Sequence, residues 1–204
     1  MKVTVTGSKR FFLLTNLDFD PEEFEEPENE LPETIQMKEE KQETTAEEQK
    51  LKLQKFMFGI EPKIGKGSFE AKSKRFLTEC QSWINAGDSS IVKYNPTTKK
   101  YCFSAVSGSA EDSLVGETFS ASTGIMGFCI QKNLSLHVRN VENDERFAKN
   151  IADNVGVPVK DLFCVPITNG HRVIGAAEFL NSKSESGFED VEIEMIKYAV
   201  RFLS

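Results

Sequence analysis

Two apolar segments near the end of the sequence constrain the fold more than any other feature. They read LFCVPI at residues 162–167 and RVIGAAEFLN at residues 172–181, and Asn169 and Gly170 lie between them. Asn-Gly between two such segments is the strongest short-range signal of a β-hairpin, because both residues tolerate the positive φ angles of a type I′ turn. The sequence therefore predicts two antiparallel strands here, preceded by a short helix at residues 145–154.

The remaining segments place this hairpin in an α+β fold. Apolar residues recur at helical spacing in residues 69–86, 123–132 and 188–202, and β-rich segments occupy residues 89–95, 100–107, 117–120 and 134–138. The sequence Asn-Pro-Thr-Thr at 95–98 supplies a turn between the first two strands. We expect a central antiparallel sheet of about six strands with helices on both faces, and no parallel crossover.

The chain divides into three regions by composition. Residues 1–17 are β-rich, residues 18–58 form an acidic linker followed by a helix, and residues 69–204 hold most of the apolar residues. Residues 18–50 carry 14 Asp or Glu against 3 Lys, which is typical of a solvated segment. Gly59 is a plausible carboxy-terminal cap for the helix, and we expect a flexible joint after it.

Charge and hydropathy exclude several classes of partner. The formal net charge of −7 argues against nucleic acid or an anionic membrane surface as the main partner. No segment approaches the roughly 20 consecutive apolar residues of a membrane helix, and the amino terminus lacks a secretory pattern. We therefore expect a cytoplasmic protein without a membrane or nucleic-acid partner.

The cysteines do not suggest a metal site. Cys80, Cys102, Cys129 and Cys164 contain no CxxC pair, and the chain has only two His. We expect no bound metal. The last three cysteines lie within apolar segments, where a reduced core thiol is the common arrangement.

Four further segments, taken in order, resemble a known family. They read LVGETFSASTGIMGFCIQKN, VENDERF, DNVGVPVKDLFCVPI and GHRVIGAAEFLN, and an amphipathic helix follows. This pattern is similar to the GAF domain, over residues 70–204. Asn181, Lys183, Phe188 and Glu192 most resemble the signature in GAF domains of cyclic nucleotide phosphodiesterases and adenylyl cyclases. The resemblance implies a GAF or PAS-like sheet. It also implies that the signature residues act as a structural clamp.

The resemblance also implies a ligand pocket between the sheet and the small helices. Of the positions that bind cyclic nucleotides, the Glu of the last strand and the Ser of the first are retained, whereas the aromatic residue, the Asp and both Thr are replaced. The ligand-binding positions carried over are Ser90, Ser107, Ile125, Met126, Val155, Val159 and Glu178. An unknown small molecule, a cyclic nucleotide or no ligand at all remain open, and no cofactor is specified.

The expected function is regulatory rather than catalytic, with no catalytic residue assigned. A homodimer through the helices at 69–86 and 188–202 and a protein partner for the amino-terminal extension are expected, because any signal must leave through an interface. The enzyme alternative is a reductase of free methionine sulfoxide. It requires an activated thiolate and a resolving cysteine, and no cysteine lies within twenty residues of Cys129.

Overall fold

The computed structural model describes the backbone of residues 33–108, 111–147 and 158–204. It describes the side chains of residues 46–108, 113–147 and 158–204. Residues 45–204 form one compact unit. The β-rich segment predicted at residues 1–17 and the linker up to residue 32 lie outside the described residues.

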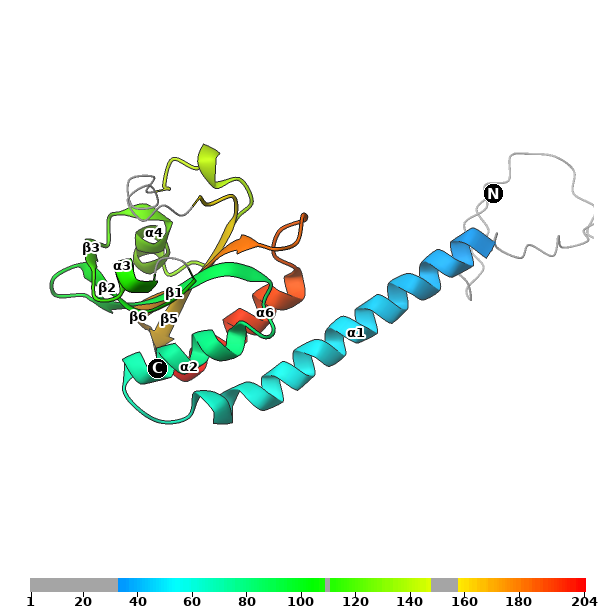
Figure 1. Ribbon diagram of the computed structural model, residues 1–204, viewed down its shortest axis with the longest axis horizontal. Helices are drawn as coiled ribbons and strands as arrows, with labels where there is room; N and C mark the ends of the chain where they lie inside the picture. The colour runs from blue at the N-terminus through cyan, green and yellow to red at the C-terminus, as the bar shows by residue number, and fades with distance from the viewer. Residues whose placement is uncertain (1–32, 109–110, 148–157) are drawn as a thin grey trace, which may run out of the picture. The chain divides into compact units, whose positions relative to one another are not determined.

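The compact unit is built on a six-stranded sheet in which every pair of neighbours is antiparallel (Figure 1). The strands lie in the order β3-β2-β1-β6-β5-β4. Their bounds are β1 Ala86–Asn95, β2 Lys100–Ser107, β3 Thr118–Ser120, β4 Leu136–Val138, β5 Leu162–Asn169 and β6 Arg172–Ser182. The predicted antiparallel α+β sheet is therefore confirmed.

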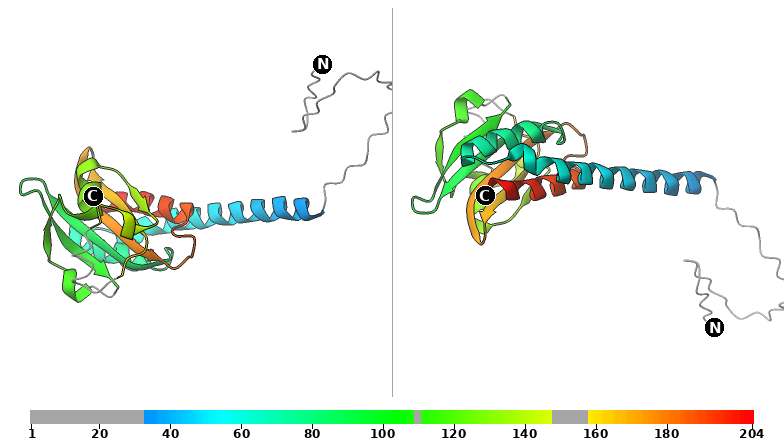
Figure 2. Two further views of the ribbon diagram at one scale, coloured as in Figure 1. Left: turned by 90° about the horizontal axis from the view of Figure 1, so that it is seen from above. Right: turned by 90° about the horizontal axis from the view of Figure 1, so that it is seen from below.

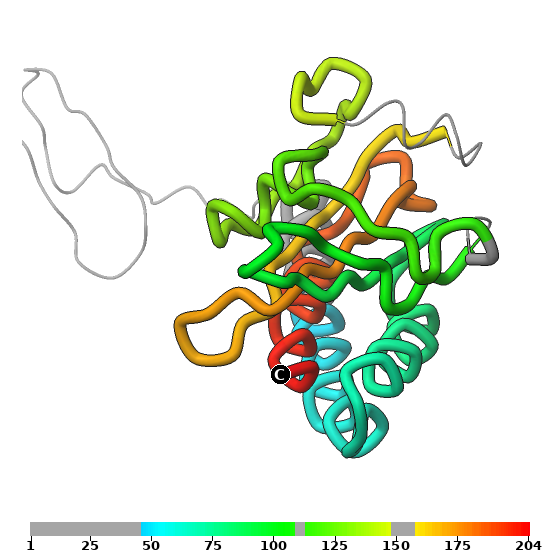
Figure 3. Tube along the Cα trace, turned by 90° about the vertical axis from the view of Figure 1, so that its left-hand side faces the viewer, coloured from blue at the N-terminus to red at the C-terminus, as the bar shows by residue number. Residues whose placement is uncertain are grey.

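Helices cover both faces of this sheet. On one face, the last turns of α1 lie beside α2 and α6, as Figures 2 and 3 show. On the other face, α4 is the only long helix in the described part of the chain (Figure 1). The bounds are α1 Glu33–Ile64, α2 Phe69–Cys80, α3 Glu111–Leu114, α4 Gly124–Lys132 and α6 Asp190–Ala199, with 3-10 turns η1 Val141–Asn143 and η2 Val200–Leu203. The two faces carry separate apolar clusters, so the sheet divides the core into two layers.

The predicted end of the first helix at Gly59 is wrong, because α1 continues to Ile64. Phe56, Ile60 and Ile64 are each buried in the cluster beneath α2 and α6. Arg75 on α2 donates a hydrogen bond of 2.6 Å to the Ile64 carbonyl and fixes the end of the helix. Tertiary burial of these side chains outweighs the weak helix propensity of glycine.

The hairpin of β5 and β6 forms as predicted, but its turn lies one residue later than Asn169-Gly170: Asn169 pairs with Arg172, so Gly170 and His171 make the turn, and Gly170 has a φ of 58°. The strands show an alternating pattern. Phe163, Val165 and Ile167 face the α1, α2 and α6 side, while Leu162 and Cys164 face α4. This alternation follows from the two-residue period of a strand. The helix predicted at 145–154 is not formed at residues 145–147, and residues 148–154 lie outside the described part of the chain.

Candidate functional site

A line of residues crosses the sheet on the face toward α4. Register pairs Val106 with Ser90, Ser90 with Glu178, Glu178 with Cys164, and Cys164 with Leu136. Directly opposed residues of neighbouring strands point to the same face, so these five side chains form one row under α4. Three of them are apolar or a thiol, which makes the carboxyl group at the centre conspicuous.

Glu178 is a carboxyl group without a partner. Among the described residues it has no hydrogen bond and no ion pair. Burial raises the pKa of its carboxyl from 4.5 to about 7. The residue nevertheless keeps part of its surface open to solvent. A carboxyl group whose pKa burial perturbs in this way is a candidate for ligand recognition.

Tyr101 and Cys164 share the environment of Glu178. Burial raises the pKa of the Tyr101 hydroxyl, and the charge of Glu178 adds to that effect. The hydroxyl donates a hydrogen bond of 3.4 Å to the carbonyl of Thr123, the residue before α4. Tyr101 therefore links the sheet near Glu178 to the start of α4.

Two cysteines distant in the sequence meet between α4 and β5. Cys129 and Cys164 are both fully buried, and both are free thiols. Burial raises the pKa of the Cys164 thiol well above its usual value, and hydrogen bonding with the Cys129 thiol raises it further. Cys164 lies 35 positions beyond Cys129 in the sequence, so no local pattern indicates this pair. The packing of α4 on β5 brings the two thiols together.

The structure brings together some of the predicted ligand-binding residues. Ser90 and Glu178 are neighbours in the row, and Ser90 is buried. Ile125 and Met126 are buried on α4 over the same face, and Val159 packs against that cluster.

Two predicted positions fall elsewhere. The Ser107 hydroxyl accepts a hydrogen bond from the amide of Gln81, the residue that follows α2. Because Val106 faces the Glu178 row, its neighbour Ser107 points toward the opposite face. Val155 lies outside the described residues.

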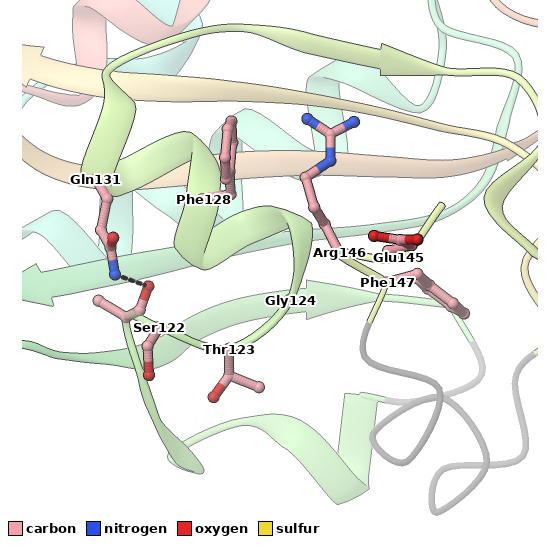
Figure 4. Close-up of a pocket in the computed structure, with 9 residues that line it drawn as sticks. Ser122, Thr123, Gly124, Phe128, Gln131, Glu145, Arg146 and Phe147 are labelled. Carbon is pink, nitrogen blue, oxygen red and sulfur yellow. Dashed lines mark hydrogen bonds between the residues drawn. The ribbon is translucent and has the colours of Figure 1, made fainter. Parts of the chain in front are cut away.

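A second feature of this face is a cavity of about 420 Å³ at the start of α4, shown in Figure 4. Arg146 forms its cationic wall. The guanidinium lies 4.9 Å from the centre of the Phe128 ring and makes two hydrogen bonds, of 2.9 and 2.6 Å, to the Asp144 carboxylate. This pairing lowers the pKa of Asp144 and raises that of Arg146.

The polar wall of the same cavity comes from α4. Thr123 caps the helix without a side-chain hydrogen bond, and Gln131 donates to the Ala121 carbonyl at 2.7 Å (Figure 4). The first-turn N–H groups of a helix favour negative charge. The cavity therefore offers hydrogen-bond donors, whereas Glu178 offers an acceptor.

The residues of the predicted clamp hold the edge of the site. Asn181 adopts a φ of 57°, accepts a hydrogen bond from the Lys160 N–H and donates one to the Pro158 carbonyl. Glu192 is fully buried, and its carboxylate accepts the N–H of Asn85 at 2.7 Å and that of Glu189 at 2.9 Å. Both side chains fasten backbone and are not free to bind a ligand.

The described residues contain no group of three or more His, Cys, Asp or Glu placed to hold a metal ion. Within the same residues, no helix combines the length and the apolar character needed to cross a membrane.

Comparison with known proteins places the fold. The family profile described as GAF domain matches residues 73–204. The A. aeolicus nlh2 GAF domain, crystallised in an inactive state, is 21% identical, with a TM-score of 0.62 over 76% of this chain and 94% of that one. The GAF domain of a Coxiella burnetii phosphoenolpyruvate-protein phosphotransferase is 13% identical, with a TM-score of 0.67 over 75% of this chain and 90% of that one.

An enzyme with the same fold also resembles the chain. Free methionine-R-sulfoxide reductase from Neisseria meningitidis, solved with its substrate, is 13% identical, with a TM-score of 0.61 over 74% of this chain and 85% of that one. At such identities the likeness establishes the fold alone. No curated protein sequence matches the chain.

Proposed function

The chain belongs to the GAF domain family over residues 73–204, and on that premise we propose that it is a non-catalytic sensor of a small molecule. GAF domains are generally regulatory or sensory. The ligand would bind on the α4 face of the sheet, where Glu178 would recognise it. The observation that carries this proposal is the unpartnered carboxyl of Glu178 in the centre of an otherwise weakly polar row.

An unpartnered carboxyl in this position costs stability. Moving an ionisable group out of water without a partner is unfavourable, and the raised pKa of Glu178 reflects that cost. An apolar residue at this position of β6 would pack without the penalty. Perturbed carboxyls of this kind cluster at functional sites, which favours a ligand that supplies the missing partner.

The chemistry of the row limits the ligand. Glu178 accepts hydrogen bonds, and the neighbouring Ser90 hydroxyl both donates and accepts. A ligand with an N–H or amine group next to a flat apolar part would satisfy both and would pack against Ile125 and Met126. A cyclic nucleotide is the more specific alternative ligand. Glu178 and Ser90 support it, because both match positions that bind cyclic nucleotides, and the apolar Val159 weakens it, because it stands where such domains have a Thr.

A second candidate function is reduction of free methionine sulfoxide. The contact between Cys129 and Cys164 favours it, because one thiol of such a pair can resolve the other. Two observations weigh against it. The pKa of Cys164 is raised, which disfavours the thiolate, and both side chains are fully buried from a substrate. We therefore propose a binding role and keep catalysis as the alternative.

The proposed location is the cytoplasm. Cys80, Cys102, Cys129 and Cys164 are all free thiols. Reduced cysteines are typical of compartments that keep thiols reduced.

The test is a thermal-shift screen of the full chain against amines, amino acids, nucleobases, cyclic AMP, cyclic GMP and methionine sulfoxide. A ligand at about 100 times its dissociation constant should add about 2.7 kcal/mol, or roughly 5–10 °C in Tm. The shift should disappear in Glu178→Gln and persist in Glu194→Gln, a matched change on the exposed side of α6.

Two outcomes would overturn the proposal. A ligand that stabilises Glu178→Gln as much as the wild type would show that Glu178 does not recognise it. Turnover of methionine sulfoxide that is abolished by Cys129→Ser would replace the sensor with the reductase.

A further inference from the structure

A second cavity, of about 520 Å³, lies at the end of the sheet that carries the turn between β1 and β2. All of its lining residues belong to β1, β2, β3 and that turn. It is larger than the cavity of about 420 Å³ at the start of α4, and its volume falls in the range of small-molecule sites. The cavity is therefore large enough to hold a small metabolite.

Register places this cavity on the face of the sheet opposite to α4. Cys102 pairs with Lys93 on β1 and with Thr118 on β3, so these three side chains form one row. Their neighbours Val92 and Phe103 are buried in the cluster under α4, and successive strand residues point to opposite faces. The row therefore points away from α4, and the candidate site described above lies on the other face of the sheet.

The wall of the cavity is positively charged. Residues 93–100 contain three Lys and no Asp or Glu, in a chain whose formal net charge is −7. Lys93 and Lys100 both line the cavity, one directly across from Cys102 and the other two positions before it on the same face of β2. Lys100 forms no ion pair with a described residue. Two ammonium groups beside a concave surface favour an anionic ligand.

The ion pair that Lys93 makes is open to displacement. Its Nζ lies 3.1 Å from Oε1 of Glu70, and the two side chains are 56% and 49% exposed. Exposed pairs of this kind contribute little, because water and salt screen the charges. An anion in the cavity can therefore replace Glu70 as the partner of Lys93, and removal of the Glu70 charge should favour that anion.

We propose that this cavity binds a small organic anion, a phosphate ester or a carboxylate, through Lys93 and Lys100. The Thr118 hydroxyl on its wall supplies a further hydrogen-bond donor. Pro96 and the half-buried Cys102 offer apolar surface to the remainder of the ligand. Binding here is independent of any ligand at Glu178, because the two sites lie on opposite faces of the sheet.

The thiol of Cys102 reports on the cavity, because it is partly open to solvent whereas the other three cysteines are buried. Peptide mass mapping of the folded full chain gives the rates at which iodoacetate, an anion, and neutral iodoacetamide alkylate this thiol. At low salt we expect the ratio of the two rates to favour iodoacetate on the order of tenfold more than in the unfolded chain. Added salt should reduce that preference.

Substitution tests the two lysines. The preference for iodoacetate should disappear in the double variant Lys93→Gln with Lys100→Gln. It should persist in Lys132→Gln with Lys183→Gln, a matched loss of two exposed lysines outside the cavity. Both cavity lysines are exposed, so their replacement should not disturb the fold, and slow labelling of the three buried cysteines checks this. A preference that survives the loss of both cavity lysines would refute the proposed site.

Two probes, phenyl phosphate and benzoate at up to about 10 mM, then distinguish a phosphate ligand from a carboxylate. We expect saturable protection of Cys102 from iodoacetamide, and the probe that protects at the lower concentration identifies the class. Glu70→Gln should strengthen the protection roughly threefold, because it frees Lys93, and Glu178→Gln should leave it unchanged. The proposal fails if neither probe protects, or if protection is equal in the variant that lacks Lys93 and Lys100.

Discussion

Replacing Glu178 by glutamine removes one titratable carboxyl from the sheet beneath α4 and preserves the shape of the side chain. In the folded protein, burial raises the pKa of this carboxyl from 4.5 to about 7. Well below pH 4.5 the group is protonated in the folded and unfolded chains alike and adds no pH dependence. Between pH 4.5 and 7 the unfolded chain releases a proton that the folded chain keeps, so stability falls as pH rises.

The size of this fall follows from the two pKa values. Each pH unit between 4.5 and 7 corresponds to about 1.4 kcal/mol, which gives an upper limit of about 3 kcal/mol. Since the side chain is partly open to solvent, we expect about 2 kcal/mol. The loss levels off above pH 7. Glu178→Gln lacks this titration, so its stability relative to wild type should increase by about 2 kcal/mol between pH 4.5 and 8.

Urea unfolding, followed by the fluorescence of Trp83, measures the effect at several pH values across this range. The chain has one tryptophan, and it packs beside α1 in the core. Glu194→Gln is the control, because it makes the same chemical change at an exposed position of α6. If the free-energy difference between wild type and Glu178→Gln is the same at both ends of the range, the carboxyl is not desolvated and the proposed recognition group loses its basis.

Three further changes test the packing, each by urea unfolding. Gly127→Ala should cost about 2–3 kcal/mol, because the new methyl group would overlap the backbone carbonyl oxygen of Ala121; a loss under about 1 kcal/mol would contradict that close approach. Phe56→Ala should cost about 3–5 kcal/mol and Phe58→Ala under about 0.5 kcal/mol in dilute protein, since only the first is buried; equal losses would show that α1 does not dock as described. Glu192→Ala should cost about 2–4 kcal/mol, because it strands two backbone N–H groups, and a neutral result would contradict the clamp.

The sheet could be predicted wherever local signals agree. β5 and β6 begin at Leu162 and Arg172, as the sequence indicates, because a turn residue with positive φ, Gly170, closes the hairpin and alternation sets the face of each residue. The turn itself is Gly170-His171 rather than Asn169-Gly170. The end of α1 could not be predicted in this way. Glycine at position 59 favours a helix end locally, but the burial of Ile60 and Ile64 against α2 and α6 outweighs it.

The candidate site, too, could be predicted only in part from the sequence. Ser90 and Glu178 follow from the resemblance, and their pairing in the sheet places them together. Only one of Val106 and Ser107 can share their face, because neighbours in a strand point apart, and the register selects Val106. No local pattern links Cys129 to Cys164, whose contact depends on how α4 packs on β5.

By itself the sequence determined the strands and the hairpin, since those depend on turn residues and on short-period patterns of apolar residues, and its resemblance to a known family indicated the GAF fold. Tertiary structure alone decided that Glu178 lacks a partner, that two distant thiols meet and that α1 buries one side while leaving Phe58 in solvent. Each of these depends on contacts between segments far apart in the chain. Such contacts are set by which surfaces pack together, and no local pattern encodes them.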